Sequence, residues 1–571
     1  MARYREKILP VAPASILLAF IFLLIFQPWS LGERELSWHE GYIVTLQNGM
    51  EMAPPLVKAH GEAVPNMQPL FPLFSAAATA LGCPVELSSR VISLVALAGL
   101  TVLVFMVAYR TRSDVSAGAC AGAMMISSVL VIDKAVDGVP ESLLALLLLG
   151  GQLIWYYFAA VRGNWTRAWL AGFITCAVGF YLNGLPAVIL FLVPLIFMRR
   201  PLGIFRKLGN RGVMLGLGIL FLTILLWYLP YHLAGGRVAA VYPQMALLDG
   251  KEYLCHLLFF PWDFALRLLP WALLAWAPYC VAIQSLDDTP MFSRFLRTVF
   301  LTDFFLLWLI PADEKHSWLI LVPPLAIMTA LNYSITVRRY GNFFRKLCNI
   351  AAWVLMPLSA AALLTFFLLP ADLLTGVFEP ERSLAFSDEF GRTVLGTVSG
   401  AMLLITALIL WKMREKPPVW CYFMLVVVAP VMVYNNIVLP YQSQERPRQE
   451  RAEILRQALD QDGAPQGVLI YKYGINDLFT ESVYLGSPVQ KVASLNNLPG
   501  AEQPVVYLFA ESFPECAERS WRSLVPGSLV SRNQKFNLWR GSWQENLPAE
   551  RKESPLLEEI RKNPDGRGGA R

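Results

Sequence analysis

The run VAPASILLAFIFLLIFQP, residues 11–28, is an almost unbroken apolar stretch near the start of the chain. A helix of this length is long enough to cross the hydrocarbon core of a bilayer. Basic residues precede the run, as they do in a signal peptide, but no small-residue cleavage site follows it and other apolar runs do. We therefore predict a retained membrane-spanning helix.

Comparable runs recur along the chain, in which 56% of the 571 residues are hydrophobic and only 16% are charged. This composition is typical of a polytopic membrane protein. The pattern predicts about thirteen spans, at residues 11–29, 88–109, 115–132, 139–161, 168–182, 184–198, 212–234, 263–284, 297–311, 317–334, 350–370, 393–411 and 419–439. Only Asn183-Gly184 separates the fifth and sixth, so one broken helix is the alternative there.

Charges in the predicted loops indicate the orientation, because Lys and Arg accumulate on the side of a membrane that is not translocated. If the N-terminus is cytoplasmic, the inside loops are the basic ones, at residues 110–112, 162–167, 199–211, 294–297, 338–346 and 412–416. The opposite loops, such as 312–314 and 372–389, are neutral or acidic. This asymmetry accounts for the net charge of +6, so we expect membrane lipids and no nucleic acid as partners.

Two regions lie outside the predicted spans. The first extracytoplasmic loop, residues 30–87, is long enough to build a site and includes an apolar piece that fits an interfacial helix. From residue 441 onward the composition becomes charged and polar, with helical patterns at 444–460 and 477–485 and strand patterns at 467–471 and 504–509. The sequence therefore predicts an all-α polytopic membrane domain at 1–440, a small extracytoplasmic α/β domain at 441–549 and a disordered tail at 550–571.

The first loop carries Trp38-His39-Glu40-Gly41-Tyr42, which places an acidic residue just beyond the first span. A carboxylate at the edge of hydrocarbon is costly unless it is solvated or has a function. Glu40 is thus either an ordinary interfacial acid or part of a site. The eight cysteines are scattered with no C-x-x-C pair, so we expect neither a disulfide framework nor a cysteine metal site.

The chain resembles the GT-C fold glycosyltransferases in three features: the first loop with its acidic motif, the Pro69-Leu70 pair, and an Arg at the start of the next span. The nearest branch contains the lipid A aminoarabinose transferase and relatives of the protein O-mannosyltransferases. The resemblance implies a bacterial inner-membrane enzyme with a cytoplasmic N-terminus and a periplasmic C-terminal domain. It also implies that a sugar moves from a polyprenyl-phosphate donor to a lipid, glycan or protein acceptor.

The family's motifs fall on particular residues of this chain. Its Asp-Glu pair falls on His39-Glu40, so the Asp is replaced, and its Lys-Pro-Pro-Leu motif falls on residues 67–70, where only Pro-Leu is kept. Arg90 matches the family Arg at the second span, and Lys315 matches the Lys of the family's Ser-x-Lys-x-x-Tyr-x-Leu-Pro pattern. A second family carboxylate falls on either Asp137 or Glu141.

The chemistry of such a transfer needs a base for the acceptor and positive charge for the departing phosphate. The resemblance makes Glu40, His39, Asp137 and Glu141 the candidate catalytic residues. Lys315 and Arg90 are the candidate ligands of the donor phosphate. A divalent metal held by Glu40 and His39 is one option for a cofactor.

Each assignment has a simpler structural explanation beside it. Arg90 could snorkel from the end of its span, Lys315 could pair with a neighbour, and an acid at 137 or 141 could stabilise the start of a helix. A lipid-linked sugar transporter or flippase and a non-catalytic scaffold are the alternative functions. A transporter typically shows repeated halves, which this sequence does not.

Overall fold

The computed structural model describes residues 10–52, 55–64, 68–198, 203–236, 250–311, 315–368, 390–412, 417–443, 446–500, 502–516, 519–525, 527–531 and 534–543. The chain forms two compact units, Met1–Gln449 and Glu450–Arg571. The domain limits at 440 and 549 remain predictions, and the tail expected to be disordered lies outside the described residues.

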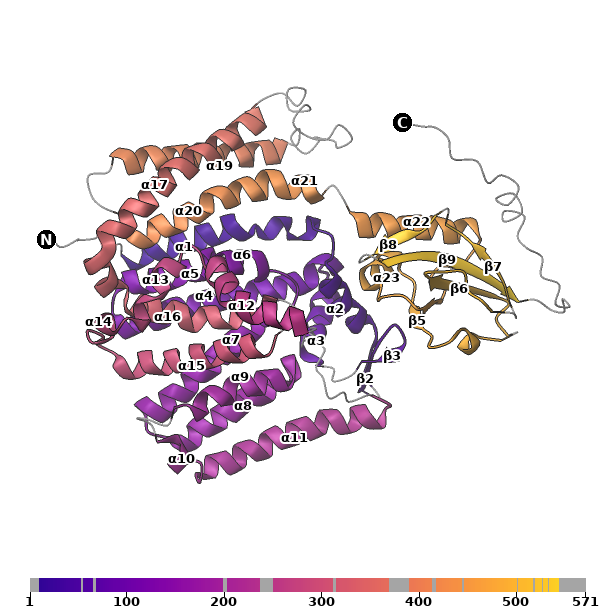
Figure 1. The fold of residues 1–571 in the computed structure, drawn as a ribbon, viewed down its shortest axis with the longest axis horizontal. Coiled ribbons are helices and arrows are strands. Elements are labelled where there is room, and N and C mark those ends of the chain that lie inside the picture. Colours follow the sequence, from indigo (N-terminus) through magenta and orange to yellow (C-terminus); the bar gives the residue numbers. More distant parts are fainter. Residues whose placement is uncertain are drawn as a thin grey trace. The chain divides into compact units, whose positions relative to one another are not determined.

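The larger unit is built almost entirely of helices, many of which run side by side (Figure 1). Its helices, 3-10 and π turns (η) and short strands are α1 (Val11–Phe26), η1 (Pro28–Glu33), α2 (Trp38–Asn48), β1 (Met50–Met52), β2 (Pro55–Ala59), β3 (Glu62–Ala63), α3 (Leu70–Ala80), α4 (Val85–Arg112), α5 (Val115–Ser127), α6 (Val129–Lys134), α7 (Glu141–Tyr156), η2 (Tyr157–Val161), α8 (Trp165–Asn183), α9 (Leu185–Ile196), α10 (Ile204–Lys207), α11 (Arg211–Leu233), α12 (Gly250–Arg267), α13 (Ala272–Ala275), η3 (Ala277–Tyr279), α14 (Val281–Gln284), α15 (Pro290–Leu309), η4 (Lys315–Leu321), α16 (Val322–Leu331), α17 (Tyr333–Leu368), α19 (Phe390–Lys412), α20 (Val419–Val433), η6 (Tyr434–Val438) and α21 (Leu439–Ser443).

The prediction of a polytopic membrane protein is confirmed. Within the described residues, seven helices are long and apolar enough to cross a membrane, or eight if the bent pair Gly250–Arg267 and Ala272–Tyr279 forms one span. The number of about thirteen spans is not confirmed, because several predicted spans are shorter apolar helices, such as α5 and α9. Several large apolar side chains of α11 are exposed, among them Met214 at 74% and Phe221 at 67%, as suits a surface that faces lipid.

Three local features refine the predicted spans. Gly184, with φ 69°, separates α8 from α9, so the fifth and sixth predicted spans are two helices. The loop predicted at 335–349 is instead part of the continuous helix α17, because the Arg and Lys residues there are good helix formers. The span predicted at 263–284 is wrong as a single straight helix, since the chain bends by 110° between α12 and the helical turns that follow.

Helices α5 and α16 form the centre of the larger unit and contact each other. Every residue from Ser116 to Ser127 and every residue of α16 is buried. Small residues allow this close packing: a Cβ on Gly118 would lie 3.0 Å from the Cβ of Tyr109 on α4. The packed centre therefore holds α6, which follows α5, and η4, which precedes α16. These two segments contact each other.

The smaller unit is an α/β unit. Its elements are α22 (Pro447–Gln461), β4 (Ile470–Tyr473), α23 (Phe479–Leu485), β5 (Val489–Lys491), η7 (Leu495–Asn497), β6 (Val505–Ala510), β7 (Arg519–Ser523), β8 (Leu529–Ser531) and β9 (Gln534–Trp543). The sheet order is β5-β4-β6-β9-β7, and β8 pairs with β9. Strand β4 is parallel to β5 and β6, while β9 is antiparallel to β6. The predicted helices and strands correspond to α22, α23, β4 and β6.

Candidate active site

Glu40 lies in the first turn of α2, where a capping box fixes its side chain. The hydroxyl of Ser37 accepts a hydrogen bond from the Glu40 N–H at 3.3 Å, and Oε2 of Glu40 accepts one from the Ser37 N–H at 2.8 Å. This reciprocal arrangement satisfies two N–H groups at the start of the helix. It also turns the carboxylate inward, where Glu40 is only 2% exposed.

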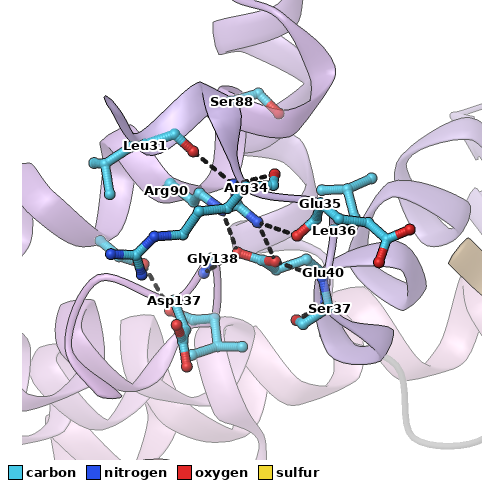
Figure 2. A network of polar contacts seen from close by, with 12 residues as sticks. Leu31, Arg34, Glu35, Leu36, Ser37, Glu40, Ser88, Arg90, Asp137 and Gly138 are labelled. Carbon is cyan, nitrogen blue, oxygen red and sulfur yellow. Dashed lines mark hydrogen bonds and ion pairs between the residues drawn. The ribbon is translucent and has the colours of Figure 1, made fainter. Parts of the chain in front are cut away.

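Arg90 of α4 is the main partner of this carboxylate (Figure 2). Its Nε and Nη2 donate to Oε1 and Oε2 of Glu40 at 2.6 and 2.7 Å. Its remaining N–H groups donate to the carbonyl oxygens of Leu31 (2.6 Å), Arg34 (2.9 Å) and Glu35 (2.9 Å). A guanidinium has five N–H donors, and these five bonds use all of them.

Gly138 completes the surroundings of Glu40. Its N–H donates to Oε1 of Glu40 at 3.0 Å, which ties α2 to the segment between α6 and α7. A Cβ at this position would lie 2.0 Å from the Ser89 hydroxyl oxygen and 3.2 Å from Cγ of Glu40. Glycine is therefore required here because the backbone approaches α4 and α2 so closely.

These contacts determine the proton affinity of Glu40 and the donors that Arg90 has available. Burial by itself raises the pKa of the Glu40 carboxyl, but the hydrogen bonds and charge of Arg90, together with the Ser37 and Gly138 N–H groups, lower it to about 2. A carboxylate of such low pKa is a poor general base. Arg90 does not snorkel, and its donors are already used. Glu40 and Arg90 therefore form a buried structural clamp, and the catalytic and phosphate-binding roles predicted for them stay predictions.

Asp137 and His316 form the second feature of the site. Nε2 of His316 donates to Oδ2 of Asp137 at 2.8 Å; the histidine side chain is 6% exposed and the aspartate side chain 30%. Burial lowers the pKa of His316, but the hydrogen bond that His316 donates to Asp137 and the charges of Glu141 and Asp137 outweigh this effect and raise the pKa. His316 lies in η4, just before the buried helix α16, so the pair joins the two segments that extend from the centre.

His39 and Glu141 lie close to this pair. The rings of His39 and His316 have centroids 6.2 Å apart, and Trp38 packs edge-on against His39 at 4.9 Å. Glu141 opens α7, where an acid is stabilised by the helix N-terminus. Of the two carboxylates left open by the sequence, Asp137 hydrogen-bonds His316 at 2.8 Å, and both carboxylate side chains are partly exposed.

Lys315 has a different partner from the sequence neighbours expected above. Its Nζ lies 2.5 Å from Oδ2 of Asp263 on α12 and 5.5 Å from the ring centroid of Trp318, and its side chain is 40% exposed. Asp263 also binds Arg267 at 2.9 Å, and Arg267 binds Asp133 at 2.9 Å. This network was not predicted from the sequence, although Asp263 and Arg267 have the i, i+4 spacing of a helical ion pair.

A metal ion in a protein is held by clustered side chains such as His, Cys, Asp and Glu. In the described ranges, no group of three or more His, Cys, Asp or Glu side chains could hold a metal ion. Of the residues matched to the Lys-Pro-Pro-Leu motif, Met67 lies outside the described residues.

No protein-family model and no curated protein matches this sequence. The fold, however, is similar to that of ArnT from Cupriavidus metallidurans bound to undecaprenyl phosphate, with a TM-score of 0.63 at 16% identity over 93% of this chain and 98% of that chain. The apo state of the same ArnT gives a TM-score of 0.63 at 15% identity over the same shares. The GT-C fold predicted from the sequence is thereby confirmed.

Proposed function

We propose that this chain is an integral membrane glycosyltransferase that moves a sugar from a polyprenyl-phosphate donor to a lipid, glycan or protein acceptor. The observation that carries the proposal is the fold shared with ArnT over nearly the whole of both chains, in a structure that binds undecaprenyl phosphate. Because a fold does not by itself determine a function, the charged site must be able to perform the chemistry.

Asp137 is the best-supported base for this reaction. In an inverting transfer the acceptor oxygen or nitrogen attacks the anomeric carbon, the bond from that carbon to the phosphate oxygen breaks, and the acceptor loses a proton. A carboxylate within hydrogen-bond reach can take this proton. Asp137 is partly exposed and oriented by His316, whereas Glu40 is buried with both oxygens bonded. His39 lies near enough to line the same site.

Lys315 is the proposed ligand of the departing phosphate. Lys315 is next to the Asp137–His316 pair, because it is the residue before His316 in η4. Its side chain is partly exposed. An ammonium carries three N–H groups, so a contact with Asp263 leaves others for phosphate oxygens. Negative charge that develops on the leaving phosphate is stabilised by this fixed positive charge.

The proposed orientation puts the site on the extracytoplasmic side of a bacterial inner membrane, with the N-terminus inside. The alternation of basic loops supports it. In a cysteine-free background, an impermeant thiol reagent should label Lys251→Cys but not Arg339→Cys in intact spheroplasts. Labelling at position 339 alone would reverse the orientation.

Mass spectrometry of envelope lipids, glycans and proteins from a deletion strain tests the function. We expect one sugar substituent to be missing, and to return with the wild-type gene. Asp137→Asn should restore less than about one hundredth of it, the usual scale for loss of a general base. The matched control is Asp288→Asn, because Asp288 is 78% exposed and pairs with Arg112.

The possible results distinguish a failure of the proposed function from a failure of the role proposed for Asp137. An unchanged envelope in the deletion strain would contradict glycosyl transfer. Full restoration by Asp137→Asn would remove Asp137 from the mechanism and leave the function standing.

A further inference from the structure

A cavity of about 280 Å³ lies within the helical unit, between η1, the end of α17, the start of α19 and the η6–α21 segment. Its polar lining includes Glu33, Arg34 and Arg392, and its apolar walls include Trp29 and Phe367. This volume is near the lower end of the range for small-molecule sites. It suits a head group better than a whole polyprenyl lipid.

The charges of this lining do not cancel. Arg392 pairs with Glu33, with Nη2 2.7 Å from Oε2. Arg34 remains as a second cation, and among the described residues its buried Nε has no hydrogen-bond partner. Burial and the charge of Arg90 lower the pKa of Arg34, although an arginine stays protonated in proteins. The cavity therefore carries one more positive charge than its side chains neutralise.

Arg34 is also held in place beside the proposed base. Its carbonyl oxygen accepts the bond from Arg90, so the Glu40–Arg90 clamp fixes its backbone (Figure 2). The same clamp bonds the N–H of Gly138, the residue after Asp137, so it joins the segments that carry Arg34 and Asp137.

We propose that this cavity binds the phosphate head group of a membrane lipid, with Arg34 as the main cation and Arg392 beside it. A guanidinium presents paired N–H donors that match phosphate oxygens, and the apolar walls suit the first carbons of a lipid chain. Arg90, predicted from the sequence to bind the donor phosphate, uses all five of its N–H donors within the clamp and does not line the cavity, whereas Arg34 does line it. The inference rests on the proposed function in one respect: the donor carrier is one of two sources of such a head group, and an ordinary phospholipid is the other.

The test is direct binding to the purified full chain in detergent, followed by native mass spectrometry without turnover. The probes are undecaprenyl phosphate, undecaprenol as its phosphate-free counterpart, dioleoyl phosphatidic acid and inorganic phosphate as a competitor. Arg34→Gln removes the charge. Gly391→Phe fills the cavity without changing charge, because Gly391 lines it and a Cβ there meets nothing within 4 Å.

Each variant has a matched control outside the cavity. Gly218 on α11 also has nothing within 4 Å of a built Cβ, so Gly218→Phe controls for the added ring. Arg294 is exposed on α15, so Arg294→Gln controls for the lost charge. Thermal unfolding of all four variants shows whether each is folded.

We expect the wild-type chain to prefer undecaprenyl phosphate to undecaprenol, and both cavity variants to weaken that binding by about 10-fold or more while the controls do not. A preference for undecaprenyl phosphate over phosphatidic acid would assign the site to the donor carrier, and equal binding would assign it to phospholipid head groups. Competition by inorganic phosphate would show that the phosphate itself is recognised.

Two results would overturn the inference. If the wild-type chain distinguishes undecaprenyl phosphate from undecaprenol but both cavity variants bind like the wild type, the phosphate binds elsewhere and only the cavity assignment fails. If the wild-type chain does not distinguish any phosphorylated lipid from its neutral counterpart, the cavity assignment and the donor of the proposed function fail together.

Discussion

Glu40 and Arg90 lie 50 positions apart in the sequence and form an ion pair with a 2.6 Å distance between Oε1 and Nε. Their side chains are 2% and 4% exposed, so water does not screen the pair. Through the carbonyl oxygens of η1 and the loop after it, and through Gly138, the pair holds together the segments that surround Asp137. Its main effect is therefore expected on folding and on the geometry of the site.

Glu40→Gln should destabilise the protein. The change leaves Arg90 buried without its counter-charge, which typically costs about 3–5 kcal/mol. Thermal unfolding in detergent measures the loss, and Glu502→Gln, at an exposed position, is the control. Unchanged unfolding combined with transfer slowed about 100-fold would instead support the catalytic role predicted for Glu40.

Acid should weaken the same interaction. The pKa of Glu40 is about 2 in the folded protein and near 4.5 in the unfolded chain. Its contribution to stability, on the order of 3 kcal/mol, is therefore fully present above pH 4.5 and is lost as the pH falls toward 2. Unfolding measured across this window should show a smaller acid dependence in Glu40→Gln than in the wild type. Equal acid dependence would mean that other carboxylates dominate.

Gly138→Ala should also destabilise the fold, by about 1–3 kcal/mol, because the new methyl group would overlap the Ser89 hydroxyl. Ser89→Gly in the same chain should restore part of the loss by opening that space. Gly150→Ala on α7, where a Cβ meets nothing within 4 Å, should be neutral or stabilising. A harmless Gly138→Ala would show that the two segments can move apart.

His316→Gln should slow transfer while leaving donor binding nearly unchanged, because in the proposed mechanism His316 orients Asp137 and Lys315 contacts the donor phosphate. The raised pKa of His316 means that the stabilisation from the protonated pair is fully present below the ordinary histidine pKa near 6.5 and is lost as the pH rises through the folded value. The alkaline limb of the rate profile should therefore change in the variant. An unchanged profile would limit His316 to packing.

Lys315→Met should weaken donor binding by about 1.5–3 kcal/mol, as expected for loss of one charge-assisted hydrogen bond, and Lys315→Arg should restore only part. Lys251→Met, at an exposed position of α12, is the surface-charge control. Asp263→Asn tests whether the effect arises from the broken ion pair instead. Equal defects in Lys315→Met and Lys251→Met would contradict a specific phosphate contact.

The gross architecture was predictable from the sequence because hydropathy and loop charge are local properties. A run such as residues 11–28 is apolar whatever surrounds it, and the change of composition after residue 440 marks a different environment. The limits of helices were harder to predict. The charged residues in the middle of α17 predicted a loop because they are polar. Arg and Lys favour a helical backbone, however, and the helix continues through them.

The sequence by itself determined that this chain is a polytopic membrane protein with a GT-C fold and that charged residues gather in its loops. Only the tertiary structure decided which of them are available for chemistry. Glu40 was predicted as a base, but its carboxylate is paired with Arg90. The sequence does not separate Asp137 from Glu141, and folding brings His316, 179 positions away, within hydrogen-bond distance of Asp137. The reason is physical: the proton affinity and free donors of a side chain depend on burial and on partners that only folding brings within a few ångströms.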